Sequence, residues 1–138
     1  LFPHSGTFSA NPITMTAGLV AMELFDEAAV AHINALAKRA RDAIEEAIRS
    51  TGVRACVTGG GSMFRVHFKE SPPLNHREAF ATPEENRQLA VWLDHLFSEG
   101  LLMINTGSAA LSTVMGEAEI DVLIAAMKGG FEKVTEAP

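Results

Sequence analysis

The sequence holds a single cysteine among its 138 residues and no apolar run long enough to cross a membrane. Cys56 has no partner for an internal disulfide, which favours a reducing, cytoplasmic setting. A bilayer span needs roughly 20 apolar residues, and no stretch of this chain reaches that length. The first residues also lack the basic segment that precedes the apolar core of a signal peptide. We therefore expect no membrane partner.

Basic residues are also scarce. Lys and Arg number 11 against 17 Asp and Glu, which gives a net charge of −6. Nucleic-acid binding depends on clustered Lys and Arg, so we expect no nucleic-acid partner. The five histidines are scattered and do not show the paired spacing of a metal site. We predict no metal centre and assign the histidines structural or surface roles.

Four helical patterns are present. Asn11 is a suitable cap and Pro12 a suitable first residue for a helix that is apolar on almost every side. Helices of that kind are buried, so we expect this one to pack against structure outside the chain. The other three patterns have one apolar face and one polar face. The four helices are expected over residues 12–25, 27–50 and 83–99, and from 117 onwards.

Three strands are expected among the helices, over residues 55–58, 62–69 and 101–104. The second strand alternates, with Phe64, Val66 and Phe68 on one face. The third is fully apolar and is predicted to be a buried strand, and Cys56 in the first is expected to be a buried small hydrophobe. The fold class is therefore α+β: a small, mainly antiparallel sheet with helices packed on it, preceded by the buried helix.

The stretch from Ser5 to Pro12 reads Ser-Gly-Thr-Phe-Ser-Ala-Asn-Pro. It places a glycine and several hydroxyl groups directly before a helix. Free N–H groups and the dipole at a helix start favour an anion. The same residue types also form ordinary loops and caps, so these physical arguments leave both interpretations open.

The exact order of residues in this stretch is more specific than its composition. Gly-Thr-Phe-Ser-Ala-Asn-Pro, followed by Ile-Thr-Met-Thr-Ala-Gly, closely resembles a hallmark of class III (fold type I) aminotransferases, which depend on pyridoxal 5′-phosphate (PLP). The preceding His4-Ser5 makes it most similar to the branch of glutamate-1-semialdehyde aminomutases and β-amino acid aminotransferases. Weaker likenesses cover residues 58–64, 100–104 and 112–121. The sequence is thus identified as the C-terminal part of such an enzyme.

The resemblance also implies site residues. Gly6 and Thr7 would bind the phosphate of PLP across a homodimer interface, and Ser9 and Ala10 would lie near the substrate. The catalytic lysine of the family lies upstream of this motif. We therefore assign no catalytic residue in this chain and expect it to be inactive alone.

A domain organisation follows from the same resemblance. Residues 1–26 would form the cofactor-phosphate loop and a linking helix, and residues 27–138 the C-terminal small α+β domain. The first residue is Leu rather than Met. We therefore expect a missing N-terminal large domain as a partner of this segment.

The resemblance finally implies a reaction. The parent would transfer an amino group from an amino acid to a keto acid, and residues 105–115 look closer to β-amino acid aminotransferases than to aminomutases. No arginine follows Arg87, so a carboxylate-binding arginine from the C-terminal loop is lacking. Glutamate-1-semialdehyde 2,1-aminomutase activity stays an alternative. A stand-alone α+β interaction domain, binding a partner through helix 12–25, is an alternative of another class.

Overall fold

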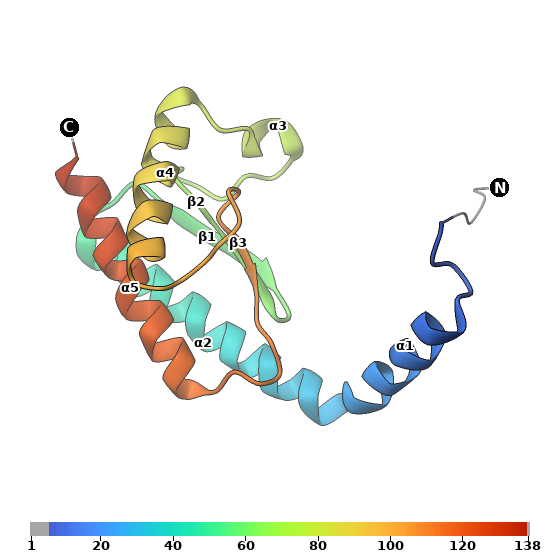
Figure 1. Cartoon of the computed structure of the whole chain (residues 1–138). Coiled ribbons are helices and arrows are strands. Elements are labelled where there is room, and N and C mark those ends of the chain that lie inside the picture. The colour runs from blue at the N-terminus through green and yellow to red at the C-terminus, as the bar shows by residue number, and fades with distance from the viewer. Residues whose placement is uncertain (1–5, 138) are drawn as a thin grey trace.

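The computed structural model describes residues 6–137, which form a small α+β domain with one helix extending away from it (Figure 1). The helices are α1 (Pro12–Leu24), α2 (Glu27–Thr51), α3 (His76–Ala79), α4 (Pro83–Ser98) and α5 (Glu117–Glu136). The strands are β1 (Cys56–Gly60), β2 (Met63–His67) and β3 (Ser108–Ala110). None of the described helices is long and apolar enough to cross a membrane.

The sheet is antiparallel, in the order β1-β2-β3. β1 and β2 form a hairpin, in which Cys56 is opposite His67 and Gly60 is opposite Met63. β3 pairs with the other side of β2, so β2 is the central strand. The predicted fold class is confirmed.

The core lies between the sheet and helices α2, α4 and α5. Phe64, Val66 and Phe68 are buried, as the predicted alternation of β2 requires. The ring of Phe131 on α5 stacks on that of Trp92 on α4, with ring centroids 5.7 Å apart. Apolar burial of this kind is the main favourable term in folding. The three helices and the sheet therefore share one core.

Local signals set the helix starts that the sequence predicts. The side chain of Asp26 accepts a hydrogen bond from the amide of Ala29, at 2.8 Å, and begins α2. Thr82 and Glu85 form a reciprocal capping box at the start of α4. Such caps satisfy amide groups that have no partner within the helix. Both helices accordingly begin where the sequence places them.

Two loops contain elements that the sequence did not predict. The loop over residues 70–81 includes the single turn α3, and the loop over 105–115 includes β3. β3 reads Ser-Ala-Ala, a composition poor in strand formers, so its conformation comes from pairing with β2. Tertiary contacts, rather than local preference, decide this strand.

The predicted buried strand over residues 101–104 is wrong for this chain. The segment is irregular, and Leu102 is 86% exposed. A strand needs a neighbour that accepts and donates main-chain hydrogen bonds, and the described residues offer none to this segment. The segment has the apolar pattern of a buried strand, but the described residues do not supply the pairing that a strand requires.

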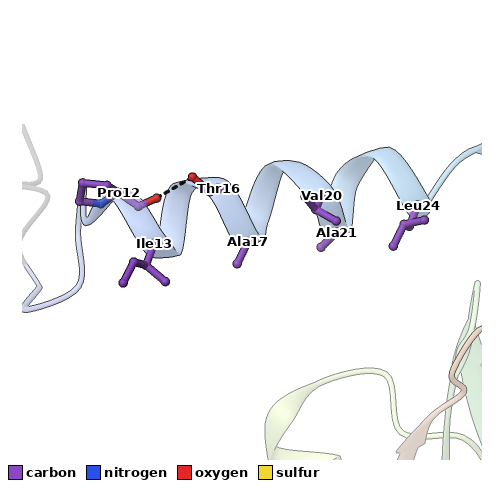
Figure 2. A pocket seen from close by; sticks show the side chains of 7 residues that line it. All are labelled: Pro12, Ile13, Thr16, Ala17, Val20, Ala21 and Leu24. Carbon is purple, nitrogen blue, oxygen red and sulfur yellow. Dashed lines mark hydrogen bonds between the residues drawn. The ribbon is translucent and has the colours of Figure 1, made fainter.

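The described residues leave α1 uncovered, and its predicted packing against structure outside the chain stays a prediction. No residue of α1 is buried, and Ile13 and Leu24 are 80% and 75% exposed. Figure 2 shows seven side chains along one face of this helix, almost all of them apolar. Apolar helices of this kind are normally covered.

Candidate functional site

The four predicted site residues lie together in one tight turn before α1. The amide of Ser9 donates to the carbonyl of Gly6 at 3.0 Å, and the amide of Asn11 donates to the carbonyl of Phe8 at 3.3 Å. Ala10, between them, has a φ of 56°. A residue other than glycine rarely adopts this left-handed conformation, which costs about 1 kcal/mol or more. The turn is therefore a specific, slightly strained shape.

Gly6 leaves little room for a side chain at the first position of this turn. A side-chain carbon on Gly6 would lie 3.1 Å from the hydroxyl oxygen of Ser9. A larger residue would require the exposed Ser9 hydroxyl to move by a few tenths of an ångström.

Asn11 caps the start of α1, as the sequence predicts. Its side-chain oxygen accepts hydrogen bonds from the amides of Ile13 at 3.0 Å and Thr14 at 3.4 Å. The first free amides of α1 are thus satisfied internally, which favours the capping interpretation of this helix start over an anion bound by its amides. Asn is a strong helix cap for this reason. Donors for an anion must come from the turn itself.

The turn does provide such donors. Within residues 6–137, the hydroxyl of Thr7 and the amides of Thr7 and Phe8 have no hydrogen-bond partner. All of these residues are exposed. A hydroxyl and adjacent amides are suited to hold the oxygens of a phosphate group. The donor set fits the phosphate of PLP and contains no cation of its own.

The described lysines form ion pairs or, in the case of Lys128, lie on α5. Lys38 and Lys133 form exposed ion pairs with Asp42 and Glu136. Lys69 is the most enclosed of those in ion pairs, with its side chain 17% exposed. None is part of the turn that holds Gly6 and Thr7.

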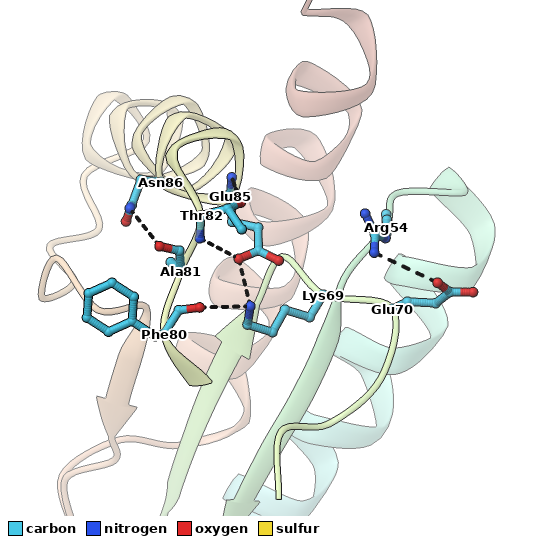
Figure 3. Close-up of polar contacts among 8 residues, drawn as sticks. All are labelled: Arg54, Lys69, Glu70, Phe80, Ala81, Thr82, Glu85 and Asn86. Atoms are coloured by element: carbon cyan, nitrogen blue, oxygen red, sulfur yellow. Dashed lines mark hydrogen bonds and ion pairs between the residues drawn. The ribbon is translucent and has the colours of Figure 1, made fainter. Parts of the chain in front are cut away.

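Lys69 has a structural partner, shown in Figure 3. Its ammonium group donates to Glu85 at 2.6 Å and to the carbonyl of Phe80 at 3.1 Å. Burial raises the pKa of Glu85, but the hydrogen bonds from Lys69 and from the amide of Thr82 outweigh it and leave the pKa below its usual value. The pair fastens the end of β2 to the start of α4. Its role is to hold the domain together.

Two further titratable groups lie on β1 and β2. His67 is 8% exposed, and its Nε2 lies 2.9 Å from the hydroxyl of Thr58. Burial, with the nearby charges of Arg65 and Lys69, lowers the pKa of His67. Its structural role was expected. Cys56 is half-buried rather than fully buried, and burial raises the pKa of its thiol.

The described residues contain no cluster of histidine, cysteine and carboxylate side chains that could hold a metal ion. The arrangement therefore points to one candidate site, the turn over residues 6–11. His4 and Ser5, which complete its motif in the sequence, lie outside the described residues.

Comparison with known proteins agrees with this geometry. The chain is 34% identical over 131 residues to an uncharacterised aminotransferase of Schizosaccharomyces pombe, covering 94% of this chain and 29% of that protein. It is 30% identical to the beta-phenylalanine transaminase of Variovorax paradoxus, covering 93% of this chain and 29% of that protein. It is also 33% identical to a glutamate-1-semialdehyde 2,1-aminomutase of Chlamydia abortus, covering 72% of this chain and 23% of that protein. No protein-family model matches the chain.

Solved structures give the same result. An omega-transaminase from Sphaerobacter thermophilus superposes with a TM-score of 0.89 at 31% identity, over 97% of this chain and 31% of that chain. The Variovorax paradoxus beta-phenylalanine aminotransferase superposes with a TM-score of 0.82 at 27% identity, over 94% and 30%. A transaminase with PLP bound superposes with a TM-score of 0.81 at 27% identity, over 98% and 30%.

The fold and these relatives place the chain among the proteins of fold type I. The chain belongs to the class III aminotransferase family, of which it represents the C-terminal part. It spans about three-tenths of the length of the relatives it matches over most of its own length.

Proposed function

We propose that this chain works as the C-terminal part of a PLP-dependent transaminase and that Gly6 and Thr7 bind the phosphate of PLP. The observation that carries the proposal is the turn over residues 6–11, with its unpartnered hydroxyl and amide donors. Class III relatives and a solved transaminase with PLP bound support it. When bound, PLP acts as the electron sink for amino-group transfer.

The chain's own residues would contribute in two ways. Thr7 would donate its hydroxyl and amide to phosphate oxygens, while Asn11 fixes the turn by capping α1. Ser9 and Ala10 lie in the same turn and would face the substrate. The exposed apolar surface of α1 would pack against the large domain of the parent. The division into residues 1–26 and 27–138 is part of this proposal.

The finer points rest on the same comparison. The phosphate would belong to the neighbouring subunit of a homodimer in the cytoplasm, and the substrates would be a β-amino acid and a keto acid. The likeness to the beta-phenylalanine transaminase supports this choice. The likeness to several aminomutases keeps glutamate-1-semialdehyde isomerisation as the second candidate. Incubation of the parent with each substrate separates the two.

A stand-alone interaction domain is supported less well. A free-standing domain of this size would be expected to cover its most apolar helix, and α1 is not covered. Two relatives that match 93–94% of the chain are named an aminotransferase and a transaminase. Both observations favour a segment that works inside a larger enzyme.

The proposal is tested by Thr7→Val in the full-length parent. Loss of one hydrogen bond to a charged group costs roughly 1.5–3 kcal/mol, which weakens PLP binding about 10- to 100-fold. The dissociation constant is measured by absorbance titration of the protein stripped of cofactor. Pyridoxal, which lacks the phosphate, should bind the variant and the parent equally.

Two matched variants sharpen this test. Thr7→Ser keeps the hydroxyl and should retain PLP affinity. Thr14→Val removes an exposed hydroxyl on α1 that makes no hydrogen bond within the described residues, and it should leave affinity unchanged. An unchanged PLP affinity in Thr7→Val, or an equal loss for pyridoxal, would refute the assigned role.

A further inference from the structure

A row of three polar side chains crosses the sheet on the face away from the core. Thr58 on β1, Arg65 on β2 and Ser108 on β3 are opposite one another in the strand register. Opposite residues project to the same face of a sheet, and Arg65 alternates with the buried Phe64 and Val66. The row therefore lies on the other face, where all three of its residues are half-buried.

Arg65 carries a positive charge that no carboxylate neutralises within residues 6–137. Four other arginines of the chain form ion pairs with nearby carboxylates: Arg39, Arg49, Arg54 and Arg87. Among the described ion pairs, none includes Arg65. A half-buried guanidinium without a carboxylate partner is suited to bind an anion.

The guanidinium is held with one edge open. Its Nε donates to the carbonyl of Thr106 at 3.0 Å, whereas Nη1 and Nη2 have no hydrogen-bond partner in the described part of the chain. The hydroxyl of Thr106 donates to that of Ser108 at 3.1 Å, so the hydroxyl hydrogen of Ser108 is free to donate. Nη1 and Nη2 can bind both oxygens of a carboxylate. Ser108 adds a third hydrogen bond from the same row.

The loop that orients Arg65 is fixed against β2. The amide of Val66 donates to the carbonyl of Gly107 at 3.0 Å. Gly107 has a φ of 72°, and a side-chain carbon there would lie 2.8 Å from the carbonyl oxygen of Val66. Glycine alone tolerates both this conformation and this close approach. Arg65 is thus oriented before any ligand binds, which reduces the entropy lost on binding.

The other ionisable side chains on this face of β2 are paired or uncharged. The ammonium group of Lys69 lies 2.6 Å from the carboxylate of Glu85. Burial, with the nearby charges of Arg65 and Lys69, lowers the pKa of His67, so its ring is uncharged at neutral pH. Its Nε2 lies 2.9 Å from the hydroxyl of Thr58. Arg65 therefore supplies the available charge on this face of β2.

An apolar row lies beside the polar one. Gly60, Met63 and Ala110 are opposite one another, two residues along the strands from the first row. All three are exposed. Two residues along a strand span about 7 Å, so one small molecule can reach both rows. Met63 suits an aromatic group there, because its thioether packs favourably against aromatic rings.

We propose that Arg65 and Ser108 bind the carboxylate of the amino-acid substrate, while Met63 and Ala110 contact its apolar side group. The inference rests on the proposed function and narrows its substrate class. β-Phenylalanine has both a carboxylate and an apolar ring, whereas glutamate 1-semialdehyde joins a carboxylate to a polar aldehyde. The loop over residues 105–115 contains no arginine, so Arg65 on the neighbouring strand supplies the cation beside this loop.

The first test is ligand binding to the PLP-loaded, full-length parent, measured by isothermal titration calorimetry. The probe 3-phenylpropanoate has the carboxylate and ring of β-phenylalanine, and 3-phenylpropanamide replaces the carboxylate with a neutral amide. Arg65→Gln should weaken 3-phenylpropanoate about 10- to 100-fold, as expected for lost hydrogen bonds to a charged group. It should leave the affinity for 3-phenylpropanamide unchanged. An equal loss for both probes, or no binding of 3-phenylpropanoate to the parent, would overturn the proposal.

Two matched variants separate ligand binding from folding. Ser108→Ala leaves the contact between Arg65 and Thr106 in place and should weaken 3-phenylpropanoate about 2- to 10-fold, as for one hydrogen bond. Arg54→Gln removes an arginine whose side chain is 68% exposed, and it should bind 3-phenylpropanoate like the parent. Equal affinities in Arg54→Gln and Arg65→Gln would contradict the assignment. Weaker PLP binding in Arg65→Gln would also contradict it, because Arg65 would then hold the phosphate.

Steady-state kinetics give a second readout. Arg65→Gln should raise KM for β-phenylalanine about 10- to 100-fold and leave KM for 1-phenylethylamine, which lacks the carboxylate, unchanged. A fall in kcat alone with both amines would indicate a structural role and refute the inference. PLP affinity in the Thr7 variants tests the proposed function separately. Normal PLP binding with unaltered 3-phenylpropanoate affinity in Arg65→Gln would refute the substrate site alone.

Discussion

The contact between α4 and α5 allows a quantitative prediction. Gly130 lies in the middle of α5, and a side-chain carbon added to it would lie 2.6 Å from Cδ1 of Trp92. The Trp92 ring is fully buried, stacks on Phe131 and meets the edge of Phe68 at a centroid distance of 6.0 Å. The ring has no free space into which it could move. Gly130→Ala should therefore overpack the core.

The expected cost combines two opposing effects. Overpacking a well-packed core costs about 1–3 kcal/mol, and the rigid ring places this case near the upper end. Replacing glycine with alanine inside a helix stabilises the helix by about 1 kcal/mol, because alanine has the higher helix propensity. The net loss in the free energy of unfolding is about 1–2 kcal/mol. For a domain of this size, that lowers the melting temperature by about 3–8 °C.

Thermal and urea unfolding of Gly130→Ala measure this loss directly, with two glycines of the same chain as controls. Gly129→Ala would place its carbon 2.8 Å from Nε2 of His95, a partly exposed side chain that can rotate away. Gly18→Ala on α1 would meet nothing within 4 Å. Neither control should destabilise appreciably. The packing argument would be refuted if Gly130→Ala were as stable as Gly18→Ala.

Two ionisable groups give further predictions. Lys69→Met leaves the enclosed carboxylate of Glu85 without its cation, so it should destabilise by about 1–3 kcal/mol in urea unfolding at pH 7, whereas Lys38→Met at an exposed pair should change little. His67 has a folded-state pKa below its unfolded value of 6.5, so the unfolded state binds more protons as the pH falls. Its contribution is complete above pH 6.5 and is lost as the pH falls towards the folded-state pKa. Urea titrations below pH 6.5 should show this loss, which His67→Gln abolishes and the exposed His76→Gln retains. If the free energy of unfolding of His67→Gln fell with pH as steeply as that of the unmodified protein, His67 would be excluded as the source of this pH dependence.

Local signals in the sequence predicted most of the helical framework. The helix starts at residues 27 and 83 and the alternation along β2 depend on neighbouring residues, and each is confirmed; caps at Asp26 and Thr82 set the two starts. β3 was missed because Ser-Ala-Ala has no strand preference of its own and acquires its conformation from β2. Long-range pairing of this kind is not encoded in a short window of sequence.

The candidate site shows a similar division. The sequence identified Gly6, Thr7, Ser9 and Ala10 through the family resemblance, and the structure places all four in one turn. The sequence also predicted Asn11 as the cap of α1, and its side chain accepts from the amides of Ile13 and Thr14. The sequence alone left open whether those amides stay free for an anion, because that contact depends on the rotamer of one side chain.

Two apolar segments show what a sequence pattern decides and what it leaves to pairing. The pattern of residues 101–104 predicted a buried strand, but the structure exposes Leu102 and Ile104 and gives the segment no strand pairing within the described residues. The pattern of α1 predicted packing against structure outside the chain, and the described residues leave this helix uncovered. Monomeric proteins rarely expose large contiguous apolar surfaces. The proposed packing of α1 against the large domain of the parent would cover this helix.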